Sequence, residues 1–229
     1  IYRGLVGSEM CIRDRLKDTV GIEVPKFIDA AECERHNCLL VSQIDGEPMQ
    51  ANMVDDDSVR AMAQYLYALH SVNFNGFGSI RQANDCQGVK SAAWQVRLLN
   101  CLTSLAKNQG FSDSVLDRIS IQLKAIQTER FVPVMMDLRW DQFAQVDSQV
   151  SGVFDLDAYV SAPIELDFVI LEYLLNAEQS KRFIEVYTEL GGVIPDIQPV
   201  REVYRTLFYL VNAMGESDYQ QWMSQADYF

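Results

Sequence analysis

The chain has 229 residues, of which 48% are hydrophobic and 22% are charged, and its formal net charge is -13 at pH 7. This composition is that of a globular protein long enough for one substantial core or two small lobes. The acidic balance argues against nucleic-acid binding, which needs a basic face, and no apolar run approaches the length of a membrane span.

The cysteines indicate a reducing compartment. Their number is odd, and they are Cys11, Cys33, Cys38, Cys86 and Cys101. No second pair accompanies Cys33 and Cys38, so the spacing does not predict a zinc site. We expect free thiols and a cytoplasmic protein.

The first segment, Ile1 to Arg15, has no helical or strand period. Charged residues interrupt it, which excludes a secretory signal. Its string GLVGSEMCIRDR resembles the translation of a sequencing adapter. We therefore expect residues 1–15 to be an artefact outside the fold, and the authentic chain to begin near Leu16 in mid-domain.

The first half of the authentic chain mixes strands and helices. We predict, in order, a helix end at 16–20, strands at 26–31 and 38–44, a turn at 45–48, a helix starting at Asp55–Asp57 and reaching 69, a linker at 73–78, and helices at 91–109 and 112–129. The three aspartates fit a helix N-terminus better than a metal site. The glycine-rich linker lacks the GK[ST] of a phosphate loop.

The second half begins with a strand-rich island. Strands are predicted at 131–136, 143–146 and 150–156, followed by helices at 164–176, 177–190, 200–214 and from Asp218 onward. The expected fold class is α+β and mostly helical. Loops between short strands in a helical lobe are where a site is expected.

Two acidic segments lie in this island: MMDLRWDQ at 135–142 and GVFDLD at 152–157. Asp137 and Asp155 each follow an apolar strand directly, whereas Asp141 and Asp147 fit exposed turn positions. Carboxylates from neighbouring strand ends can act as a base and hold a divalent metal, as phosphoryl transfer requires.

These motifs resemble those of kinase-like phosphotransferases, and the aminoglycoside phosphotransferases in particular. The first segment resembles H-G-D-L-x-x-x-N, and V-F-D-L-D resembles the family's metal-binding I-I-D-W-E. The further similarities, in the family's order, are LLVSQIDGEP at 39–48 to the strand and hinge, LYALH at 66–70 to L-A-x-L-H, and APIELD at 162–167 to G-D-P-x-x-D-L-A.

The resemblance implies a protein-kinase-like fold in which 16–48 are a remnant of the N-terminal sheet and hinge. Residues 49–229 would be the helical C-terminal lobe, with the catalytic hairpin at 131–157. It also implies a transferase that moves the γ-phosphate of ATP to the hydroxyl of an unidentified small molecule, with Mg²⁺.

The family's roles transfer to individual positions. Asp137 would accept or orient the substrate proton, and Arg139 could meet the phosphoryl group, although a solvated loop arginine is an equal alternative. Asp155 would bind Mg²⁺, with Gln142 and Asp157 as further ligands.

Other positions would edge the nucleotide or support the loop. Leu40, Val41, Ser42, Gln43 and Ile44 would border the adenine. His70 and Asp167 are expected to be structural, the aspartate by hydrogen-bonding the catalytic loop. The aromatic residues of the helices could line a substrate pocket, but at helical spacing they are more often core; they are Trp94, Tyr159, Tyr204, Tyr209 and Trp222.

The sequence departs from the family pattern in ways that favour an inactive chain. Met135 and Met136 replace the histidine and glycine before Asp137, and Gln142 replaces the metal-binding asparagine. The sequence also shows no glycine-rich phosphate loop, strand lysine or partner glutamate. We therefore expect the chain as given to transfer phosphate negligibly, since that reaction depends on positioning. The alternatives are a non-catalytic pseudokinase-like binding protein on the same fold and a helical interaction protein with a small hairpin.

Overall fold

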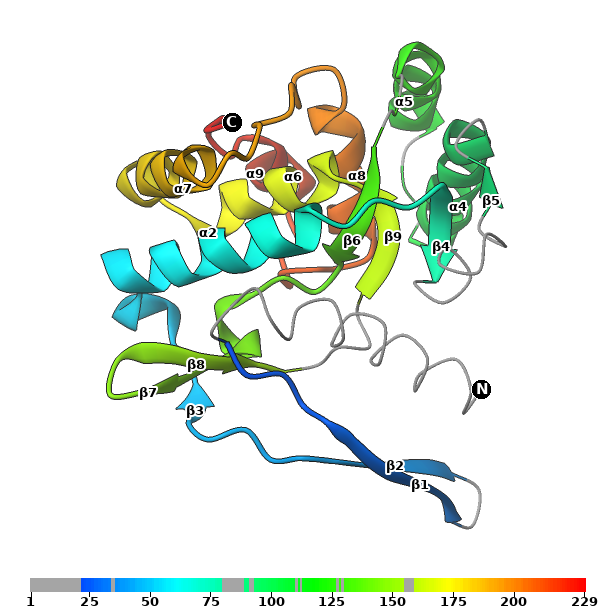
Figure 1. The fold of residues 1–229 in the computed structure, drawn as a ribbon. Helices are drawn as coiled ribbons and strands as arrows, with labels where there is room; N and C mark the ends of the chain where they lie inside the picture. Colours follow the sequence, from blue (N-terminus) through cyan, green and yellow to red (C-terminus); the bar gives the residue numbers. More distant parts are fainter. Residues whose placement is uncertain are drawn as a thin grey trace.

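The structure, a computed structural model, describes residues 22–33, 36–79, 89–90, 93–109, 111, 113–126, 128, 130–154 and 159–229. The predicted adapter segment and the helix end at 16–20 lie outside these residues. The described part of the chain contains three small antiparallel sheets and a body of helices (Figure 1).

The first sheet is a hairpin of β1 (Phe27–Cys33) and β2 (His36–Val41). Both strands were predicted, with bounds shifted by a few residues. Figure 1 shows the hairpin projecting away from the helices at the lower right. Ile28 and Leu40 are accordingly exposed.

The second sheet joins the chain after this hairpin to the predicted catalytic hairpin. Its order is β3 (Glu47–Pro48), β7 (Phe143–Val146) and β8 (Gln149–Val153). Positive φ angles at Asp147 and Ser148 make the tight turn between β7 and β8, as the right-handed strand twist favours.

Gly152 brings a third segment onto this sheet. The N–H of Glu23 donates to Ser151 O at 2.8 Å, and the N–H of Val153 donates to Glu23 O at 2.9 Å. A Cβ on Gly152 would lie 2.4 Å from Ile44 Cγ2 and 2.9 Å from Glu23 O, so no larger residue fits without a shift. The close approach fixes the chain at Glu23 and Ile44 against the β7–β8 hairpin.

The order of the third sheet is β5 (Val89–Lys90), β4 (Gly76–Ser79), β9 (Tyr159–Pro163) and β6 (Phe131–Met135). Three of these four strands, β4, β5 and β9, were not predicted from the sequence. The prediction of a linker at 73–78 was wrong from Gly76 onward. Glycines at 76 and 78 lower the strand propensity, but β4 gains its pairing from β9, an element distant in sequence.

The helices agree with the sequence to within a few residues. They are α2 (Asp56–His70), α4 (Trp94–Asn108), α5 (Asp113–Ala125), α6 (Glu165–Leu174), α7 (Ala177–Glu189), α8 (Arg201–Leu210) and α9 (Tyr219–Met223), with 3-10 turns η1 (Ala51–Met53) and η3 (Trp140–Gln142).

The predicted role of the aspartates before α2 is confirmed. Asp55 is the N-cap, and its carboxylate accepts from the N–H and the hydroxyl of Ser58 at 2.9 and 2.7 Å. These hydrogen bonds lower the pKa of Asp55. Asp56 and Asp57 are exposed in the first turn, where negative charge complements the helix dipole.

The core forms where α6 packs between the sheets and the other helices. Seven consecutive residues of α6, from Leu166 to Glu172, are buried. Phe168 contacts the rings of His70, Phe183 and Tyr187, which ties α6 to α2 and α7. Four of the five aromatic residues considered for a pocket are buried in the core, as the alternative predicted: Trp94, Tyr159, Tyr204 and Trp222.

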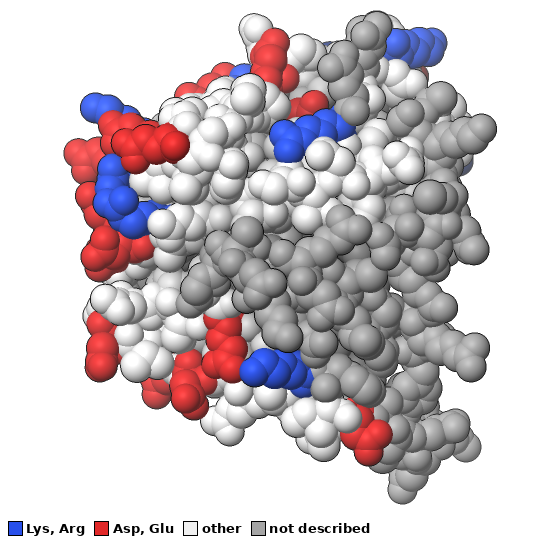
Figure 2. Space-filling model, viewed as in Figure 1, with Lys and Arg blue, Asp and Glu red and all other residues white. Residues whose placement is uncertain are grey.

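The acidic surface is uneven. In Figure 2, acidic side chains gather on the left, over α7 and the start of α2. Exposed acids there include Asp56, Asp57, Glu178 and Glu189. No helix among the described residues is long and apolar enough to cross a membrane.

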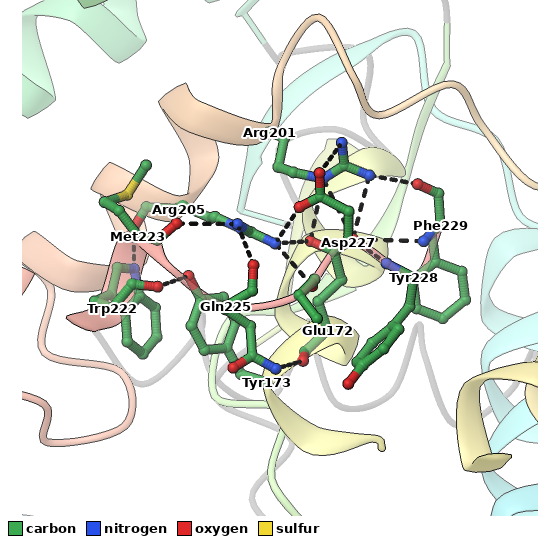
Figure 3. Close-up of polar contacts among 11 residues, drawn as sticks. Glu172, Tyr173, Arg201, Arg205, Trp222, Met223, Gln225, Asp227, Tyr228 and Phe229 are labelled. Carbon is green, nitrogen blue, oxygen red and sulfur yellow. Dashed lines mark hydrogen bonds and ion pairs between the residues drawn. The ribbon is translucent and has the colours of Figure 1, made fainter. Parts of the chain in front are cut away.

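A buried ion cluster fixes residues 222–229 against the helical body (Figure 3). Glu172 is fully buried on α6, and Arg205 of α8 donates to its Oε2 at 2.6 Å. Arg201 lies 3.3 Å from Glu172 Oε1, and the N–H of Tyr228 donates to the same oxygen at 2.9 Å. Arg205 also donates to Gln225 O at 2.9 Å. The carboxylate is thus neutralised by two guanidinium groups and satisfied by backbone donors.

We predict that Glu172→Gln lowers the free energy of unfolding by about 3–5 kcal/mol, because it leaves the buried guanidinium group of Arg205 with the exposed Asp227 carboxylate but without its buried partner. Urea unfolding of the variant and wild type measures the difference. Glu185→Gln is the control, since Glu185 forms only an exposed ion pair with Arg182 and should cost less than about 1 kcal/mol. Equal effects from both substitutions would contradict the role of the cluster.

Candidate active site

The predicted catalytic loop starts at the end of a fully buried strand. All five residues of β6 are buried, and the chain leaves the sheet after Met135. The N–H of Leu138 donates to Met135 O at 3.1 Å, and the N–H of Gln142 donates to Arg139 O at 3.2 Å. Leu138 is buried, so Met136, Asp137 and Arg139 are the more accessible members of the loop.

The buried side chain of Asp167 anchors the start of the loop by hydrogen bonding. Its Oδ1 accepts from the N–H of Met135 at 3.3 Å, and its Oδ2 lies 3.0 Å from His70 Nε2. The other ring nitrogen of His70 is 2.8 Å from the Tyr187 hydroxyl. All four residues are buried. The structural roles predicted for Asp167 and His70 are therefore confirmed.

Burial raises the pKa of Asp167, and its hydrogen bond to His70 offsets part of that effect. The folded protein therefore holds this proton more tightly than the unfolded chain does. Ionisation of Asp167 removes stability as the pH rises from the ordinary value of 3.8 through the folded-state pKa.

Two buried tyrosines, Tyr65 of α2 and Tyr159 of β9, support the strand end at Met135. The Tyr159 hydroxyl donates to Met135 Sδ at 3.2 Å and is itself hydrogen-bonded to the hydroxyl of Tyr65. Burial raises the pKa of Tyr65, so its hydroxyl stays protonated. Met135 is thus supported by polar contacts as well as apolar packing. Neither tyrosine lies in a motif, so only the pairing of β6 with β9 brings this contact to light.

Asp137 lies between two partners from its own loop. Gln142 Nε2 donates to Asp137 Oδ2 at 3.2 Å, and Arg139 Nη2 lies 3.4 Å from the same oxygen. Arg139 Nε is also 3.2 Å from Asp141 Oδ1. The Asp137 side chain is 35% exposed, whereas Gln142 is buried. The structure therefore brings together Asp137, Arg139 and Gln142, and Gln142 faces Asp137 rather than solvent.

The end of β8 meets this loop. The N–H of Phe154 donates to Gln142 O at 2.7 Å. Asp155 and Asp157, the predicted metal ligands that follow, lie outside the described residues. Within the part of the chain that is described, no three His, Cys, Asp or Glu side chains cluster in a way that would hold a metal ion.

The possible metal ligands among the described residues are of the chemical type that a hard cation prefers. Mg²⁺ prefers carboxylate and amide oxygens, and the Asp137 carboxylate and the Gln142 amide lie together. The Gln142 amide presents its nitrogen to Asp137, so rotation of the amide would be needed to direct its oxygen at a cation beside that carboxylate.

The predicted adenine-binding segment connects β2 to β3. Ser42 is fixed by two hydrogen bonds, its N–H donating to Lys26 O at 2.7 Å and its Oγ accepting from Lys26 N at 2.8 Å. Ile44 is buried against Gly152, whereas Leu40, Val41 and Gln43 are exposed. The contact of this segment with adenine stays a prediction.

Comparisons with known proteins define the fold. Searches against models of protein families and against curated protein sequences found no match. Among solved structures, macrolide 2'-phosphotransferase MphH from Brachybacterium faecium matches with a TM-score of 0.62 and 14% identity, over 99% of this chain and 81% of that one. The GDP complex of aminoglycoside 2'-phosphotransferase-IIIa matches with a TM-score of 0.62 and 14% identity, over 96% and 78%.

A third similar structure is a thermostable mutant of aminoglycoside phosphotransferase APH(4)-Ia in a ternary complex with AMP-PNP and hygromycin B. Its TM-score is 0.64 and its identity 13%, over 96% of this chain and 79% of that one. At these identities the comparisons establish the fold. The chain has the protein-kinase-like fold of these phosphotransferases, as the sequence predicted.

We predict that Asp167→Asn changes the pH dependence of stability. The free energy of unfolding of wild type minus that of the variant should fall as the pH rises above 3.8, because only the wild type must ionise a buried carboxyl group. Urea unfolding between pH 4 and pH 8 measures this difference. Asp147→Asn, in the exposed β7–β8 turn, controls for the loss of one negative charge. A difference independent of pH would show that Asp167 is not perturbed by burial.

Proposed function

We propose that the chain carries the phosphoryl-transfer site of an ATP-dependent small-molecule phosphotransferase, which moves the γ-phosphate of ATP to a substrate hydroxyl. One observation carries the proposal: Asp137 emerges from a buried strand, is accessible, and is flanked by Arg139 and Gln142. The shared fold with aminoglycoside and macrolide phosphotransferases supports it.

In the proposed reaction, the substrate hydroxyl oxygen bonds to the γ-phosphorus as the bond from that phosphorus to the bridging oxygen of ADP breaks. Asp137 accepts the hydroxyl proton. Its Oδ2 is held by Gln142 and Arg139, which leaves Oδ1 for the substrate. Arg139 faces the transferring group as a cation, and its ion pair with Asp141 orients it. Such reactions depend on positioning and electrostatic stabilisation rather than on covalent chemistry by the protein.

The nucleotide and metal are assigned as the family resemblance suggests. Asp155, Asp157 and Gln142 are the proposed Mg²⁺ ligands, and Leu40 to Ile44 the proposed border of the adenine. Mg²⁺ would neutralise charge on the nucleotide phosphates. The bond between Phe154 and Gln142 supports the proposal for Asp155, because the chain enters residue 155 from beside the loop.

We predict that Asp137→Asn lowers kcat by about 10²- to 10⁴-fold, the usual contribution of a positioned general base. The asparagine keeps the size of the side chain but accepts a proton poorly. The assay is ADP release coupled to NADH oxidation, in the full-length product of the reading frame that encodes these residues. Its acceptors are a panel of aminoglycosides, macrolides and hydroxylated glycosides.

Asp147→Asn is the matched control for this experiment. It makes the same chemical change in the same hairpin, at a left-handed turn position that asparagine adopts readily, and should leave kcat unchanged. A loss of turnover in both variants, or in neither, would contradict the role of Asp137.

A non-catalytic nucleotide-binding protein on the same fold is the second candidate, and the observation that favours it is Gln142. The side chain is one methylene longer than the family's asparagine, and its amide nitrogen faces Asp137. Mg²⁺ demands near-ideal geometry, so the longer arm opposes catalysis if Gln142 is a ligand.

We predict that Gln142→Asn shifts the Mg²⁺ concentration for half-maximal turnover and leaves the KM for the acceptor unchanged, because it alters a metal ligand and no acceptor contact. The measurement is ADP release against Mg²⁺ concentration. No shift would remove Gln142 from the ligand set. The second candidate would be favoured if the wild type binds nucleotide without turnover and the Gln142→Asn variant does turn over.

A further inference from the structure

A cavity of about 680 Å³ adjoins the catalytic loop. Residues of β4, β9, α4, α6 and α8 line it, and Met136 lines it from the loop itself. Met136 immediately precedes Asp137, so the cavity reaches the residue before the proposed base. Its volume is in the range of small-molecule sites in proteins.

The described lining of this cavity is mostly apolar. Its apolar members include Phe77, Trp94, Val96 and Val211. Val96 and Val211 are 63% and 42% exposed, so part of this apolar surface is open to solvent. Covering such apolar area with a ligand removes it from water, which makes the free energy of binding more favourable.

Met136 extends the apolar surface to the edge of the catalytic loop. The family pattern has a glycine at this position, which offers no side chain. A methionine is flexible and polarizable, and it adapts to the shape of an apolar ligand. The residue that departs from the pattern therefore contributes to the cavity rather than only crowding the loop.

The charge of the cavity is opposite to that of the chain. Arg97 is the single charged residue in its lining among the described residues, and that part of the lining contains no carboxylate. The exposed acids Asp56, Asp57, Glu178 and Glu189 lie on α2 and α7, which do not contribute to the lining. A polycation such as an aminoglycoside would meet the Arg97 guanidinium group, and the described lining offers it no carboxylate, so its binding there would cost desolvation.

We infer that this cavity takes the acceptor substrate, and that the acceptor is a hydroxylated molecule with a large apolar face that is uncharged or anionic. The inference rests on the proposed function and narrows its substrate class. The apolar face lies against Phe77, Val96 and Met136, an anionic substituent would pair with Arg97, and a hydroxyl reaches Asp137.

The test compares two probes by isothermal titration calorimetry with the full-length protein and MgADP. One is n-octyl β-D-glucoside, an uncharged hydroxylated molecule with an apolar chain, used below its micellar concentration. The other is kanamycin, a polycation. We expect the glucoside to bind more tightly. Absence of glucoside binding, or tighter binding of kanamycin, would overturn the inference.

A substitution in the lining tests whether the glucoside binds in this cavity. Val96→Asp places a carboxylate in the apolar lining and should weaken glucoside binding about tenfold, because the ligand must then desolvate a charge. Ile121→Asp is the matched control. Ile121 is 69% exposed on α5 and does not line the cavity, so it should have no effect. Equal effects of the two substitutions would place the glucoside elsewhere and overturn the inference.

The two proposals fail in different ways. If the glucoside binds in the cavity and no acceptor of any kind releases ADP, the proposed phosphoryl transfer is wrong and the ligand class stands. If kanamycin is phosphorylated with a higher kcat/KM than the glucoside, and Val96→Asp does not reduce binding, phosphoryl transfer stands and the acceptor class is wrong.

Discussion

The hydrogen bonds of the buried Asp167 side chain fix the start of the loop that carries Asp137. They join three elements that are far apart in sequence: α6, which carries the carboxylate, the end of α2, which supplies His70, and the last residue of β6. Burial makes ionisation of this group unfavourable, so its partners must be held in place by the surrounding aromatic core. Packing of Phe168 against His70 and Tyr187 does this. The position of Asp137 therefore depends on the core of the helical body.

The same arrangement explains how a loop can depart from the family pattern and keep its shape. Met135 stands where a histidine is usual, yet its N–H is bonded to Asp167 and its sulfur accepts from Tyr159. Met136 adds apolar surface toward the adjoining cavity. The Met135 side chain is thus fixed by burial and by Tyr159, whereas variation at Met136 can change what the cavity accepts.

The sequence predicted the helices and the catalytic hairpin because their signals are local. Asp55 before an amphipathic run predicted the start of α2, and Asp218 the start of α9. Strands β4, β5 and β9 escaped prediction. Gly76 and Gly78 lower the strand propensity of β4, and β9 pairs with β4 and β6, which are distant from it in sequence. Motif order placed Asp137, Arg139 and Gln142 together. The Tyr65–Tyr159–Met135 contact and the apolar cavity could not be predicted, since both depend on side chains that only the tertiary fold brings together.

We propose that the Asp137 loop transfers the γ-phosphate of ATP to a hydroxyl group. ³¹P nuclear magnetic resonance of the full-length protein with MgATP and n-octyl β-D-glucoside tests it most directly, since it identifies the phosphate that is formed. We expect the γ-phosphate signal of ATP to be replaced by that of a phosphomonoester coupled to the glucoside protons. The experiment is repeated with the other hydroxylated acceptors in place of the glucoside. Phosphate transfer by the Asp137 loop is contradicted if, with every acceptor, ATP stays unchanged or yields inorganic phosphate alone.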